Sequence, residues 1–457
     1  MNYKITDLTS HTGVKIDNFD CSKKLNLKEV EYLKNLIQEN HFICFKNQLM
    51  DEESLVHFTK NFGKLESYPE KDKTKNKEVA MFVGGCVRKH LSKEIIDDID
   101  IASIFTPIEI KEKFRETEFK VIDTGIEHGS VTVIGKENKF ELTTLRKDVK
   151  TDGRHAEVLF TEDWQQDSQR RDFTINSIYL SKNGKVYDPQ LGVPDLKQGK
   201  IKFIGKPINR IEEDYLRIIR FMRFSIHYNY LKPDFETLKA LKLNLNKIQS
   251  ISKERIFSEL NKILKLKNVN NLQTNEEIKN LFLLVFPELK FLQRLKKLDE
   301  LSNHYKVGIN MILAALLIDE KDNHEYFCHK YRTSNRLKIY LDLIFKNYIK
   351  FKSDKNYLTK HFNSNIYFLG KDNFKEVLTF LFLKNSKFSI SDYLKKIDQI
   401  KQSSSPKFPY NGKFVMDRGV PNGKKIGESL KLLENAWVKN DFKLADKDIS
   451  NIINKFQ

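Results

Sequence analysis

The spacing of apolar residues predicts a mixed α/β part followed by a long helical part. Short apolar or alternating runs, as at 80–83 and 121–135, are typical of strands. From about residue 206 onward, apolar residues recur every three or four positions, for example at 253–266 and 307–319, which predicts helices. The fold class expected from this pattern is a multidomain α+β protein whose second part is all-α.

Changes in composition suggest where the chain divides. Residues 71–78, KDKTKNKE, are charged and lack apolar periodicity, which indicates a linker. We therefore expect six segments, which are a small truncated α/β segment at 1–70, a linker at 71–78, a head with a mixed sheet at 79–205, a helical neck at 206–265, a helical body at 266–401 and a helical tail at 402–457.

The first 70 residues have the pattern of a separate unit. Apolar residues at helical spacing from Leu27 to Leu36 predict one helix, and HFICF at 41–45 predicts a buried strand. Asp51 is placed to cap a second helix that runs through Phe62.

The net charge of +18 and the isoelectric point near 9.3 favour a polyanionic partner. The chain has no apolar run of about 18 residues, which a membrane-spanning helix would need. We therefore expect nucleic acid, and no membrane, as the partner.

The cysteines and the N-terminus favour a reducing compartment. Cys21, Cys44, Cys86 and Cys328 are scattered without any Cys-x-x-Cys spacing, and MNYKITDLTS lacks a basic-then-apolar signal. Because disulfides are rare in the cytosol, the expected location is cytoplasmic.

Residues 80–103 combine a phosphate-binding pattern with two carboxylates. An apolar run ends at Gly84 and Gly85, which permit a tight turn against a ligand before a helix. Asp98 and Asp100 share one face of an extended segment, because side chains alternate along a strand. Two carboxylates on one face suit Mg²⁺, which takes oxygen ligands. This stretch therefore predicts a Mg²⁺ site beside a phosphate-binding corner.

Two further motifs carry charged residues. RRDFTINSIYL at 170–180 begins with two arginines, and paired arginines can fork onto triphosphate oxygens. IEEDYLRIIRFMRF at 211–224 predicts one helix, in which charged residues recur every three positions, namely Asp214, Arg217, Arg220 and Arg223. On this helix Asp214 and Arg217 would lie side by side.

A carboxylate beside a guanidinium can discriminate between bases. Cytosine and adenine both present an exocyclic amine beside an unprotonated ring nitrogen, whereas uracil and guanine present a carbonyl beside an N–H. The pair of Asp214 and Arg217 matches the first two bases and opposes the other two. The alternative for this spacing is a salt-bridged surface helix.

Together these motifs resemble the polymerase-β-type nucleotidyltransferases, specifically the class II tRNA nucleotidyltransferases, the family of CCA-adding enzymes and poly(A) polymerases. The resemblance covers residues 79–457 and rests on G-G-x-V-R followed by D-x-D, R-R-D-F-T-I-N, E-D-x-x-R and a C-terminal G-x-x-x-G-x-x-L-x-x-L-E-x-x-W. One position departs from the family, because Lys89 stands where an aspartate usually follows the arginine.

The resemblance implies template-independent addition of CMP and AMP to the 3′ end of tRNA, from CTP and ATP, with release of pyrophosphate. It implies that Asp98 and Asp100 are the catalytic residues that hold Mg²⁺. The residues implied to bind the nucleotide are Gly84, Gly85, Arg88, Arg171, Asp172, Asp214, Arg217, Arg220 and Arg223. Asp172 is expected to hold Arg171 or the ribose.

Other residues are candidates for supporting roles. Glu141 lies on a strand expected to run beside the two aspartates, and Arg154 lies in a polar stretch at 148–169 that resembles the family's flexible loop. The glycines at 423–427 begin a helix and are candidates to hold a tRNA phosphate. Lysines that alternate with aromatic residues in the body indicate either RNA binding or a helical core with a solvated face.

Alternatives remain at this point. Within the family, the enzyme could add only A or only CC, or make poly(A), although the retained stretch at 148–169 argues against a CC-only enzyme. A non-catalytic RNA-binding protein is disfavoured by the intact pair of Asp98 and Asp100.

An oxygenase is a further alternative, because residues 1–70 resemble the beginning of taurine dioxygenase-like Fe(II)/2-oxoglutarate enzymes. Such enzymes need two histidines and a carboxylate. The one His-x-Asp/Glu in the chain is His155-Ala156-Glu157, far inside the head. We therefore expect no bound iron and no oxygen chemistry.

Overall fold

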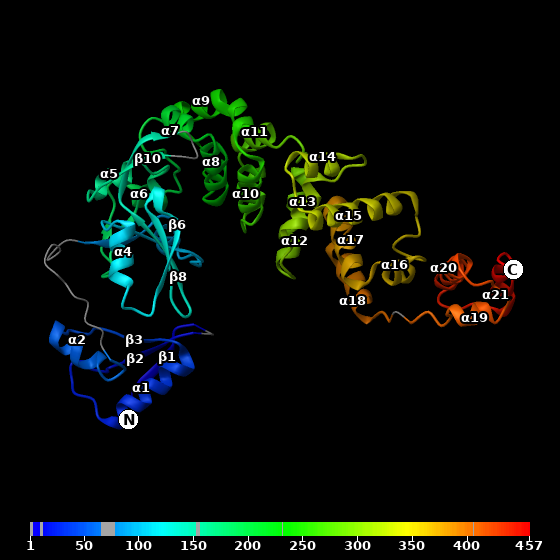
Figure 1. Ribbon diagram of the computed structural model, residues 1–457, viewed down its shortest axis with the longest axis horizontal. Coiled ribbons are helices and arrows are strands. Elements are labelled where there is room, and N and C mark those ends of the chain that lie inside the picture. The colour runs from blue at the N-terminus through cyan, green and yellow to red at the C-terminus, as the bar shows by residue number, and fades with distance from the viewer. Residues whose placement is uncertain (1–2, 10–11, 65–77, 152–155, 231, 405) are drawn as a thin grey trace. The chain divides into compact units, whose positions relative to one another are not determined.

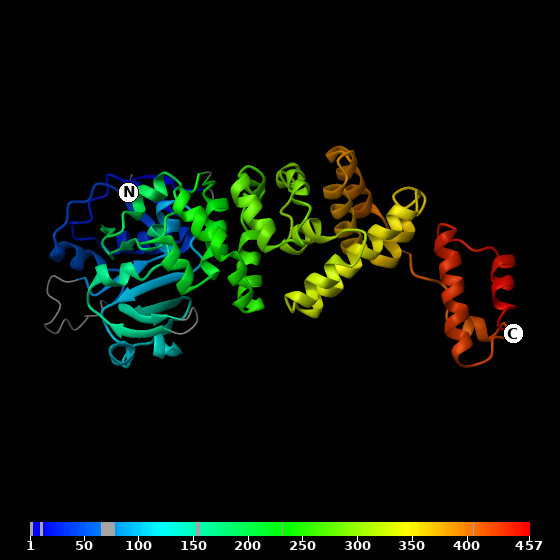
Figure 2. The same ribbon diagram turned by 90° about the horizontal axis from the view of Figure 1, so that it is seen from above.

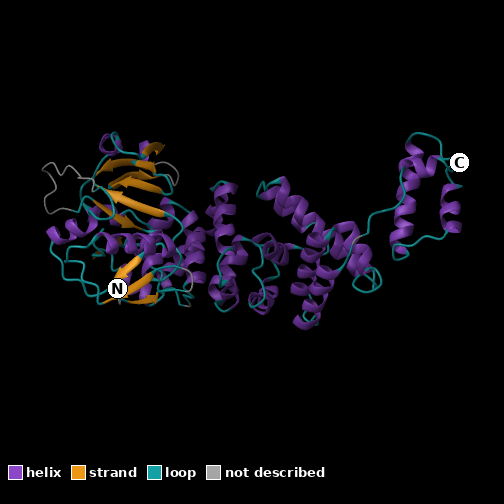
Figure 3. Ribbon diagram, turned by 90° about the horizontal axis from the view of Figure 1, so that it is seen from below, coloured by secondary structure: helices purple, strands orange, loops and turns teal. Residues whose placement is uncertain are grey.

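The computed structural model describes residues 3–9, 12–64, 78–151, 156–230, 232–404 and 406–457. They belong to two compact units, Met1–Glu78 and Val79–Gln457. Among these residues, strands occur in the first unit and in the early part of the second, and the rest is helical (Figure 1, Figure 3). The predicted multidomain α+β class is confirmed.

The first unit has a three-stranded sheet in the order β1-β2-β3. Its elements are β1 (Lys4–Asp7), β2 (Val14–Asp17), α1 (Leu27–Asn40), β3 (Ile43–Phe45) and α2 (Glu52–Thr59). Leu33 of α1 is fully buried and packs in one apolar core with Phe19 and Phe58. Asp51 caps α2 by accepting a hydrogen bond from the N–H of Ser54 at 2.8 Å. The first predicted helix is confirmed, whereas the second ends at Thr59 and does not reach Phe62. The predicted strand forms but is half-buried, because β3 lies at the edge of its sheet.

The head is built on a seven-stranded mixed sheet in the order β12-β11-β4-β5-β8-β7-β6. Its strands are β4 (Ala80–Val83), β5 (Ile99–Ser103), β6 (Lys120–Gly125), β7 (Ser130–Ile134), β8 (Lys139–Thr144), β11 (Tyr179–Leu180) and β12 (Val186–Tyr187). Strand β5 pairs antiparallel with β4 and parallel with β8. The end of β4 and the beginnings of β5 and β8 therefore meet at one edge of the sheet, which brings the glycine turn to the aspartates.

Helices cover the sheet on both faces. Ile101 and Ala102, neighbours on β5, pack into different apolar clusters, as expected for a strand that is buried on both sides. Ile110 packs in the cluster of Ile101, and Trp164 packs against that of Ala102. The helices of the head are α3 (Gly85–Leu91), α4 (Pro107–Phe114), α5 (Trp164–Gln169) and α6 (Gly192–Lys197), with the short 3₁₀ turns η1 (Ile126–His128) and η2 (Thr174–Asn176).

One prediction for the head needs correction. The polar stretch at 148–169 contains a β-hairpin, β9 (Arg146–Thr151) and β10 (Ala156–Phe160), followed by α5, because its valine, threonine and aromatic residues favour strands despite the polar composition. Arg154 lies outside the described residues. The head ends with β12, helix α6 and a single bridge between Phe173 and Phe203.

The neck contains a break inside the helix that the pattern predicts at 211–224. Helix α7 (Pro207–Glu213) ends before Asp214, and α8 (Leu216–His227) begins after it. Asp214 has extended backbone angles, φ −154° and ψ 105°, and its carboxylate accepts a hydrogen bond from the N–H of Leu216 at 3.1 Å. Aspartate favours such local capping over a helix interior. The prediction that Asp214 and Arg217 sit on one continuous helix is therefore wrong.

The remainder of the second unit is a succession of helices. They are α9 (Phe235–Asn244), η3 (Leu245–Ser250), α10 (Lys253–Leu264), η4 (Val269–Gln273), α11 (Glu276–Val285), η5 (Leu292–Leu295), α12 (Lys296–Ser302), α13 (Ile309–Leu317), α14 (Asn323–Lys330), α15 (Asn335–Ser353), α16 (Phe362–Leu369), α17 (Lys371–Lys384), α18 (Ile390–Gln402), α19 (Gly412–Met416), α20 (Lys424–Lys439) and α21 (Asp446–Ile453). One apolar core extends from the head through the neck to α18.

The body supports the core interpretation of its aromatic residues. Phe374, Phe380 and Phe382 of α17 are fully buried, and the buried side chains of α15 include Leu337 and Tyr348. No helix among the described residues is long and apolar enough to span a bilayer.

In the tail, α20 and α21 lie side by side (red in Figure 2). Gly423, at φ +121°, directly precedes α20, so the predicted helix start at 423–427 is confirmed.

Candidate functional site

Most of the predicted site residues line one pocket of about 490 Å³ formed by the head and the neck. Those that line it are Gly84, Gly85, Arg88, Asp100, Arg171, Asp172, Asp214, Arg217, Arg220 and Arg223. Residues that the sequence analysis did not single out complete it, namely Arg146, Arg170, Asn176, Leu216, Phe224 and Arg255. Asp98 and Glu141 lie outside this lining.

The glycine corner forms where β4 turns into α3. Gly84 has φ +74°, a left-handed conformation that favours glycine, and a Cβ there would lie 3.9 Å from Oδ2 of Asp100. A Cβ added to Gly85 would meet no atom within 4 Å. The backbone of the corner is therefore open to a ligand and close to the carboxylate of Asp100.

Arg88 on α3 is held from two directions. Its guanidinium donates one hydrogen bond to Oδ1 of Asn176 and another, from Nε, to the hydroxyl of Tyr228 at 3.1 Å. The residue is 8% exposed. These contacts fix the guanidinium at the wall of the pocket.

The ring of Phe224 lies beneath several guanidinium groups. The distance from the ring centre is 4.7 Å to Arg88, 4.2 Å to Arg223 and 6.0 Å to Arg220. The negative face of an aromatic ring attracts such cations. One residue of α8 therefore packs against arginines from both the head and the neck.

Carboxylates gather at the edge where β5 and β8 begin. Parallel pairing places Asp100 beside Glu141 on the neighbouring strand, as the sequence predicted. Burial raises the pKa of Asp100, and the charges of Glu141 and Asp98 add to this effect more than Arg171 and Arg88 oppose it. Asp98 is exposed, directly before β5. This excess of negative charge and of oxygen ligands fits a divalent cation.

Arg171 has a dedicated partner, Asp167. Its Nη2 donates a hydrogen bond to Oδ2 of Asp167 at 3.1 Å, and the same oxygen accepts one from the hydroxyl of Tyr179 at 2.7 Å. Burial alone would lower the pKa of Arg171, but the charges and hydrogen bonds of Asp167 and Tyr179 together outweigh burial and hold the pKa above its usual value. Arg171 therefore stays charged and oriented.

One of the two expectations for Asp172, that it holds Arg171, is not met. Its Oδ2 accepts a hydrogen bond from Nε of Arg220 at 2.7 Å, and its Oδ1 accepts from the N–H of Phe173 and from Nδ2 of Asn176, both at 2.9 Å. Burial would raise the pKa of Asp172, but Arg220, Asn176 and Arg217 together outweigh burial and hold the pKa below its usual range. Asp172 therefore connects the head to α8.

Asp214 and Arg217 line the same pocket but pair with other residues. Oδ2 of Asp214 accepts a hydrogen bond from Nη2 of Arg255 on α10 at 2.8 Å. Nη1 of Arg217 donates to Oε2 of Glu213 at 2.6 Å. The acceptor Asp214 lies in the break between α7 and α8, and the donor Arg217 lies in the first turn of α8. Each has its own oppositely charged partner.

The sequence analysis missed two partners on α10, Arg255 and Glu259. Glu259 is 2% exposed and accepts a hydrogen bond from Nε of Arg223 at 2.8 Å. Its spacing from Ile256 and Ile263 places it on the apolar face of an amphipathic helix. A carboxylate on that face is rarely buried unless it is paired. The position of Glu259 on the apolar face is therefore the sequence signal that could have revealed a charged partner.

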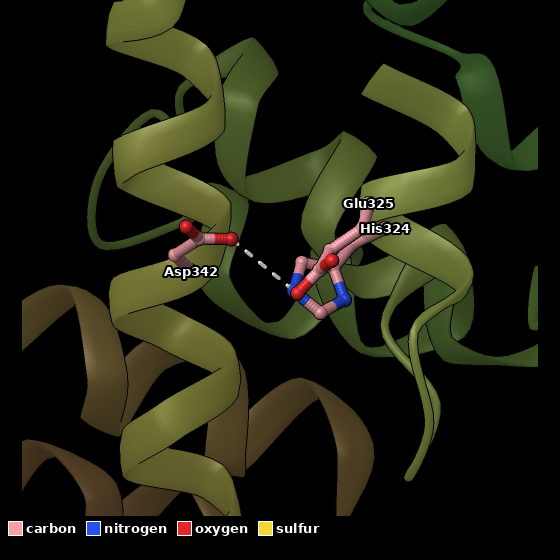
Figure 4. Close-up of side chains that lie close together, drawn as sticks. All are labelled: His324, Glu325 and Asp342. Atoms are coloured by element: carbon pink, nitrogen blue, oxygen red, sulfur yellow. Dashed lines mark ion pairs between the residues drawn. The ribbon is translucent and has the colours of Figure 1, made fainter. Parts of the chain in front are cut away.

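A second group of candidate metal ligands lies in the body, away from the pocket. His324 and Glu325 of α14 and Asp342 of α15 have ligand atoms within 4.8 Å of one another (Figure 4). Nε2 of His324 lies 3.3 Å from Oδ1 of Asp342, and the histidine ring packs against Phe345 with centroids 4.4 Å apart. These contacts join α14 to α15, and we assign the group no further role.

Two protein families match parts of the chain. The family described as "Poly A polymerase head domain" matches residues 80–202, and the family described as "Probable RNA and SrmB- binding site of polymerase A" matches residues 231–292. The first match contains the glycine corner, the carboxylates and both residues 171 and 172.

Curated relatives match most of the chain. The mitochondrial CCA tRNA nucleotidyltransferase 1 of Danio rerio is 32% identical over 83% of this chain and 88% of its own length. The enzyme of the same name from Homo sapiens is 34% identical over 81% of this chain and 86% of its own. A CCA-adding enzyme of Streptococcus uberis is 31% identical over 82% of this chain and 92% of its own.

Solved structures share the fold. The Bacillus stearothermophilus CCA-adding enzyme in complex with CTP has a TM-score of 0.63 and 24% identity, covering 82% of this chain and 92% of that one. The Thermotoga maritima CCA-adding enzyme complexed with tRNA has a TM-score of 0.57 and 20% identity, covering 83% and 92%. With the relatives above, these likenesses show that the chain belongs to the CCA tRNA nucleotidyltransferases, the family of CCA-adding enzymes.

Proposed function

We propose that the pocket performs CCA addition, with the residue roles given below. The protein takes CTP and ATP, transfers CMP and AMP to the 3′ end of tRNA and releases pyrophosphate. The observation that carries the proposal is the convergence on one pocket of the glycine corner, Asp100 and arginines from the head and the neck.

Nucleotidyltransferases of this family generally use a divalent metal ion, and we propose Mg²⁺, held by Asp98 and Asp100. The chemistry that bound Mg²⁺ supplies is neutralisation of phosphate charge and activation of the attacking 3′ hydroxyl. Glu141, beside Asp100, adds negative charge that favours the ion. In this role all three residues serve C and A addition alike.

The triphosphate is bound by the glycine corner and the arginines. Gly84 and Gly85 allow phosphate oxygens to approach the backbone, and Arg88 and Arg171 donate to them from fixed positions. Because these guanidiniums are already oriented by protein partners, little conformational entropy is lost on binding. Catalysis then consists mainly of positioning the 3′ hydroxyl in line with the α-phosphorus and neutralising charge.

Base selection falls to Asp214 and Arg217. A carboxylate and a guanidinium that face one pocket match the amine and the ring nitrogen shared by cytosine and adenine. Arg255 and Glu213 hold the two groups in place. The protein itself therefore serves as the template that selects the base. Arg220 and Arg223, held by Asp172 and Glu259, serve the triphosphate side and the packing of α8.

The body and tail bind the rest of the tRNA. The net charge of +18 supports an electrostatic contribution to this contact. Residues 423–427 at the start of α20 are proposed to hold a tRNA phosphate. Arg154, which lies outside the described residues, remains a candidate supporting residue.

A partial enzyme is the second candidate. The hairpin of β9 and β10 occupies the stretch whose retention argues against CC-only addition. The cytoplasmic location stays a prediction, because the animal relatives are named as mitochondrial. The likeness of residues 1–70 to a dioxygenase front end, and the absence of iron chemistry, also stay predictions.

The experiment that tests the proposal uses three tRNA substrates. They end before CCA, after the first C and after the second C, and each is incubated with labelled CTP, ATP or both. Full CCA on all three supports the proposal. Extension by A alone, by C alone or by a long A tail would assign a partial enzyme or a poly(A) polymerase, and no extension would overturn it.

A further inference from the structure

Lys89, the residue that departs from the family motif, forms an ion pair with Asp97. Lys89 lies on α3, and Asp97 lies in the irregular segment at 92–98 that leads to β5. Oδ1 of Asp97 accepts a hydrogen bond from Nζ of Lys89 and a second one, at 3.0 Å, from the backbone N–H of Asp98. One carboxylate oxygen therefore connects α3 to the peptide group of a proposed metal ligand.

The same segment is held at a second point in its middle. The N–H of Glu94 donates to the carbonyl of Lys89 at 2.8 Å, and its carboxylate lies 3.0 Å from Nε2 of His227 on α8. It also accepts a hydrogen bond from the hydroxyl of Tyr228 at 3.4 Å. Glu94, in the middle of the segment at 92–98, is therefore held by α8 of the neck. The position of Asp98, at the end of the segment, depends on Asp97.

The carboxylate of Asp98 has no anchor of its own. Within the part of the chain that the structure describes, it takes part in no hydrogen bond or ion pair, and the residue is exposed. Its direction is therefore set by its backbone. The backbone N–H is the group that Asp97 holds.

We propose that Lys89 is a positioning residue for metal binding, which acts through Asp97 to fix the peptide group of Asp98. The proposal rests on the proposed function, in which Asp98 and Asp100 hold Mg²⁺. It also accounts for the departure from the family, because an aspartate at position 89 would face Asp97 with like charge.

The exposure of the pair decides what it can do. The side chains of Lys89 and Asp97 are 23% and 66% exposed. Ion pairs this exposed contribute little to stability. The pair is therefore suited to orient Asp98 and contributes little to holding the fold together, so its loss should change metal affinity and leave the melting temperature almost unchanged.

The test measures metal binding directly, with Mn²⁺ as the probe and free Mn²⁺ followed by electron paramagnetic resonance. Lys89→Met and Asp97→Ala should each weaken Mn²⁺ binding about 10-fold, in the range typical of residues that orient metal ligands. The double variant should be no weaker than Asp97→Ala, because both changes remove one connection. Lys89→Arg should restore nearly normal binding, and Lys89→Asp should be the weakest of the single variants.

The matched control is Lys111→Met, which breaks another Lys–Asp pair of the head, 2.6 Å from Asp123 and away from the pocket. It should leave Mn²⁺ binding unchanged. An Mg²⁺ activation curve for CMP addition should shift by the same factors as Mn²⁺ binding.

An Asp98→Asn arm separates the two proposals. If Asp98→Asn abolishes Mn²⁺ binding while Lys89→Met binds like wild type, the positioning role of Lys89 is wrong and the proposed function stands. If Asp98→Asn binds Mn²⁺ and adds nucleotides normally, the role of Asp98 as a metal ligand and the positioning role of Lys89 are both overturned, while CCA addition stands. Additive losses in the double variant would also overturn the connection through Asp97.

Discussion

The two sides of the pocket are built in opposite ways. On the acidic side, Asp100 lies beside Glu141 and near Asp98, and the pKa of Asp100 is raised. On the arginine side, several guanidiniums have an acidic partner, as Arg171 has Asp167 and Arg220 has Asp172, whereas Arg88 is held by neutral groups. One side carries unbalanced negative charge, and on the other side much of the positive charge is balanced by the protein itself.

This difference separates groups that await a ligand from groups that hold the fold. Like charges in a partly buried place cost folding free energy, and a bound cation would remove that cost. Paired charges that are buried stabilise the fold only while both partners are present. Substitutions on the two sides should therefore affect activity and stability in different proportions.

The largest effect is expected on the acidic side. Asp98→Asn or Asp100→Asn should reduce the addition of both C and A by about 10³-fold or more, because charge neutralisation by a metal contributes several kcal/mol. Binding of tRNA should survive in both variants. Asp100→Asn without metal should melt at or above the wild-type temperature, since a repulsive charge is removed. Substantial incorporation by either variant at saturating Mg²⁺ would remove these residues from the metal site.

On the arginine side, Asp172→Asn should mainly cost stability. Removing one partner of a buried ion pair leaves Arg220 uncompensated and should lower the free energy of unfolding by about 3 kcal/mol, measured by urea denaturation. The matched control is Asp123→Asn, which breaks an exposed pair with Lys111 and should cost less than about 1 kcal/mol. Equal losses of unfolding free energy in the two variants would show that the buried pair of the arginine side contributes no more to stability than an exposed pair.

The base-selecting residues should show a third behaviour, changed selectivity. Asp214→Ala or Arg217→Ala should allow UTP or GTP to compete, with a loss of about 1–3 kcal/mol of discrimination. Competition between labelled CTP and UTP measures this ratio. Arg255→Ala should shift it in the same direction by less, because Arg255 orients Asp214. Slow variants that keep wild-type selectivity would make the pair merely structural.

The raised pKa of Asp100 predicts a pH dependence of metal binding. Protonation removes the negative charge, so protons compete with Mg²⁺ at higher pH than they would at an ordinary carboxyl. The half-saturating Mg²⁺ concentration should therefore rise as pH falls through that raised pKa, by up to about tenfold per pH unit for one displaced proton. Glu141→Gln lowers the repulsion and should move this rise to lower pH. An identical curve in both proteins would show that Glu141 does not act on Asp100.

The smallest effect is expected from removing residues 1–75. Every residue that lines the pocket belongs to the second unit. Val79, directly before β4, already pairs with the sheet, because its carbonyl accepts a hydrogen bond from the N–H of Ile104 at 3.0 Å. A chain that begins at Asn76 should keep both sides of the pocket and add nucleotides within about twofold of the full rate. Consumption of 2-oxoglutarate by the full chain, or loss of addition by a folded truncation, would show that this segment is functional.

Local motifs in the sequence were sufficient to predict most of the pocket. The glycine corner, Asp100 and Glu141 followed from strand alternation and adjacency, and the structure has them where expected. The partners of the arginines were not predictable in the same way. Arg220 reaches Asp172 and Arg223 reaches Glu259 across 48 and 36 residues, and no local spacing encodes such contacts.

The break at Asp214 shows where periodicity fails. Apolar spacing continues through the break, so the pattern predicts one helix at 211–224, while a single capping hydrogen bond to Leu216 interrupts it. The hairpin at 146–160 was hidden for the converse reason, since its polar residues masked strand-forming ones.

The shared ring of Phe224 constrains how the enzyme can move. Arg88 belongs to the head and Arg223 to the neck, and both lie against this one side chain. Because Phe224 and Arg223 both lie on α8, spreading the head from the neck at this point would separate Arg88 from the ring and expose apolar surface. A movement that makes room for a lengthening RNA end should therefore keep this contact closed, with Phe224 as its pivot.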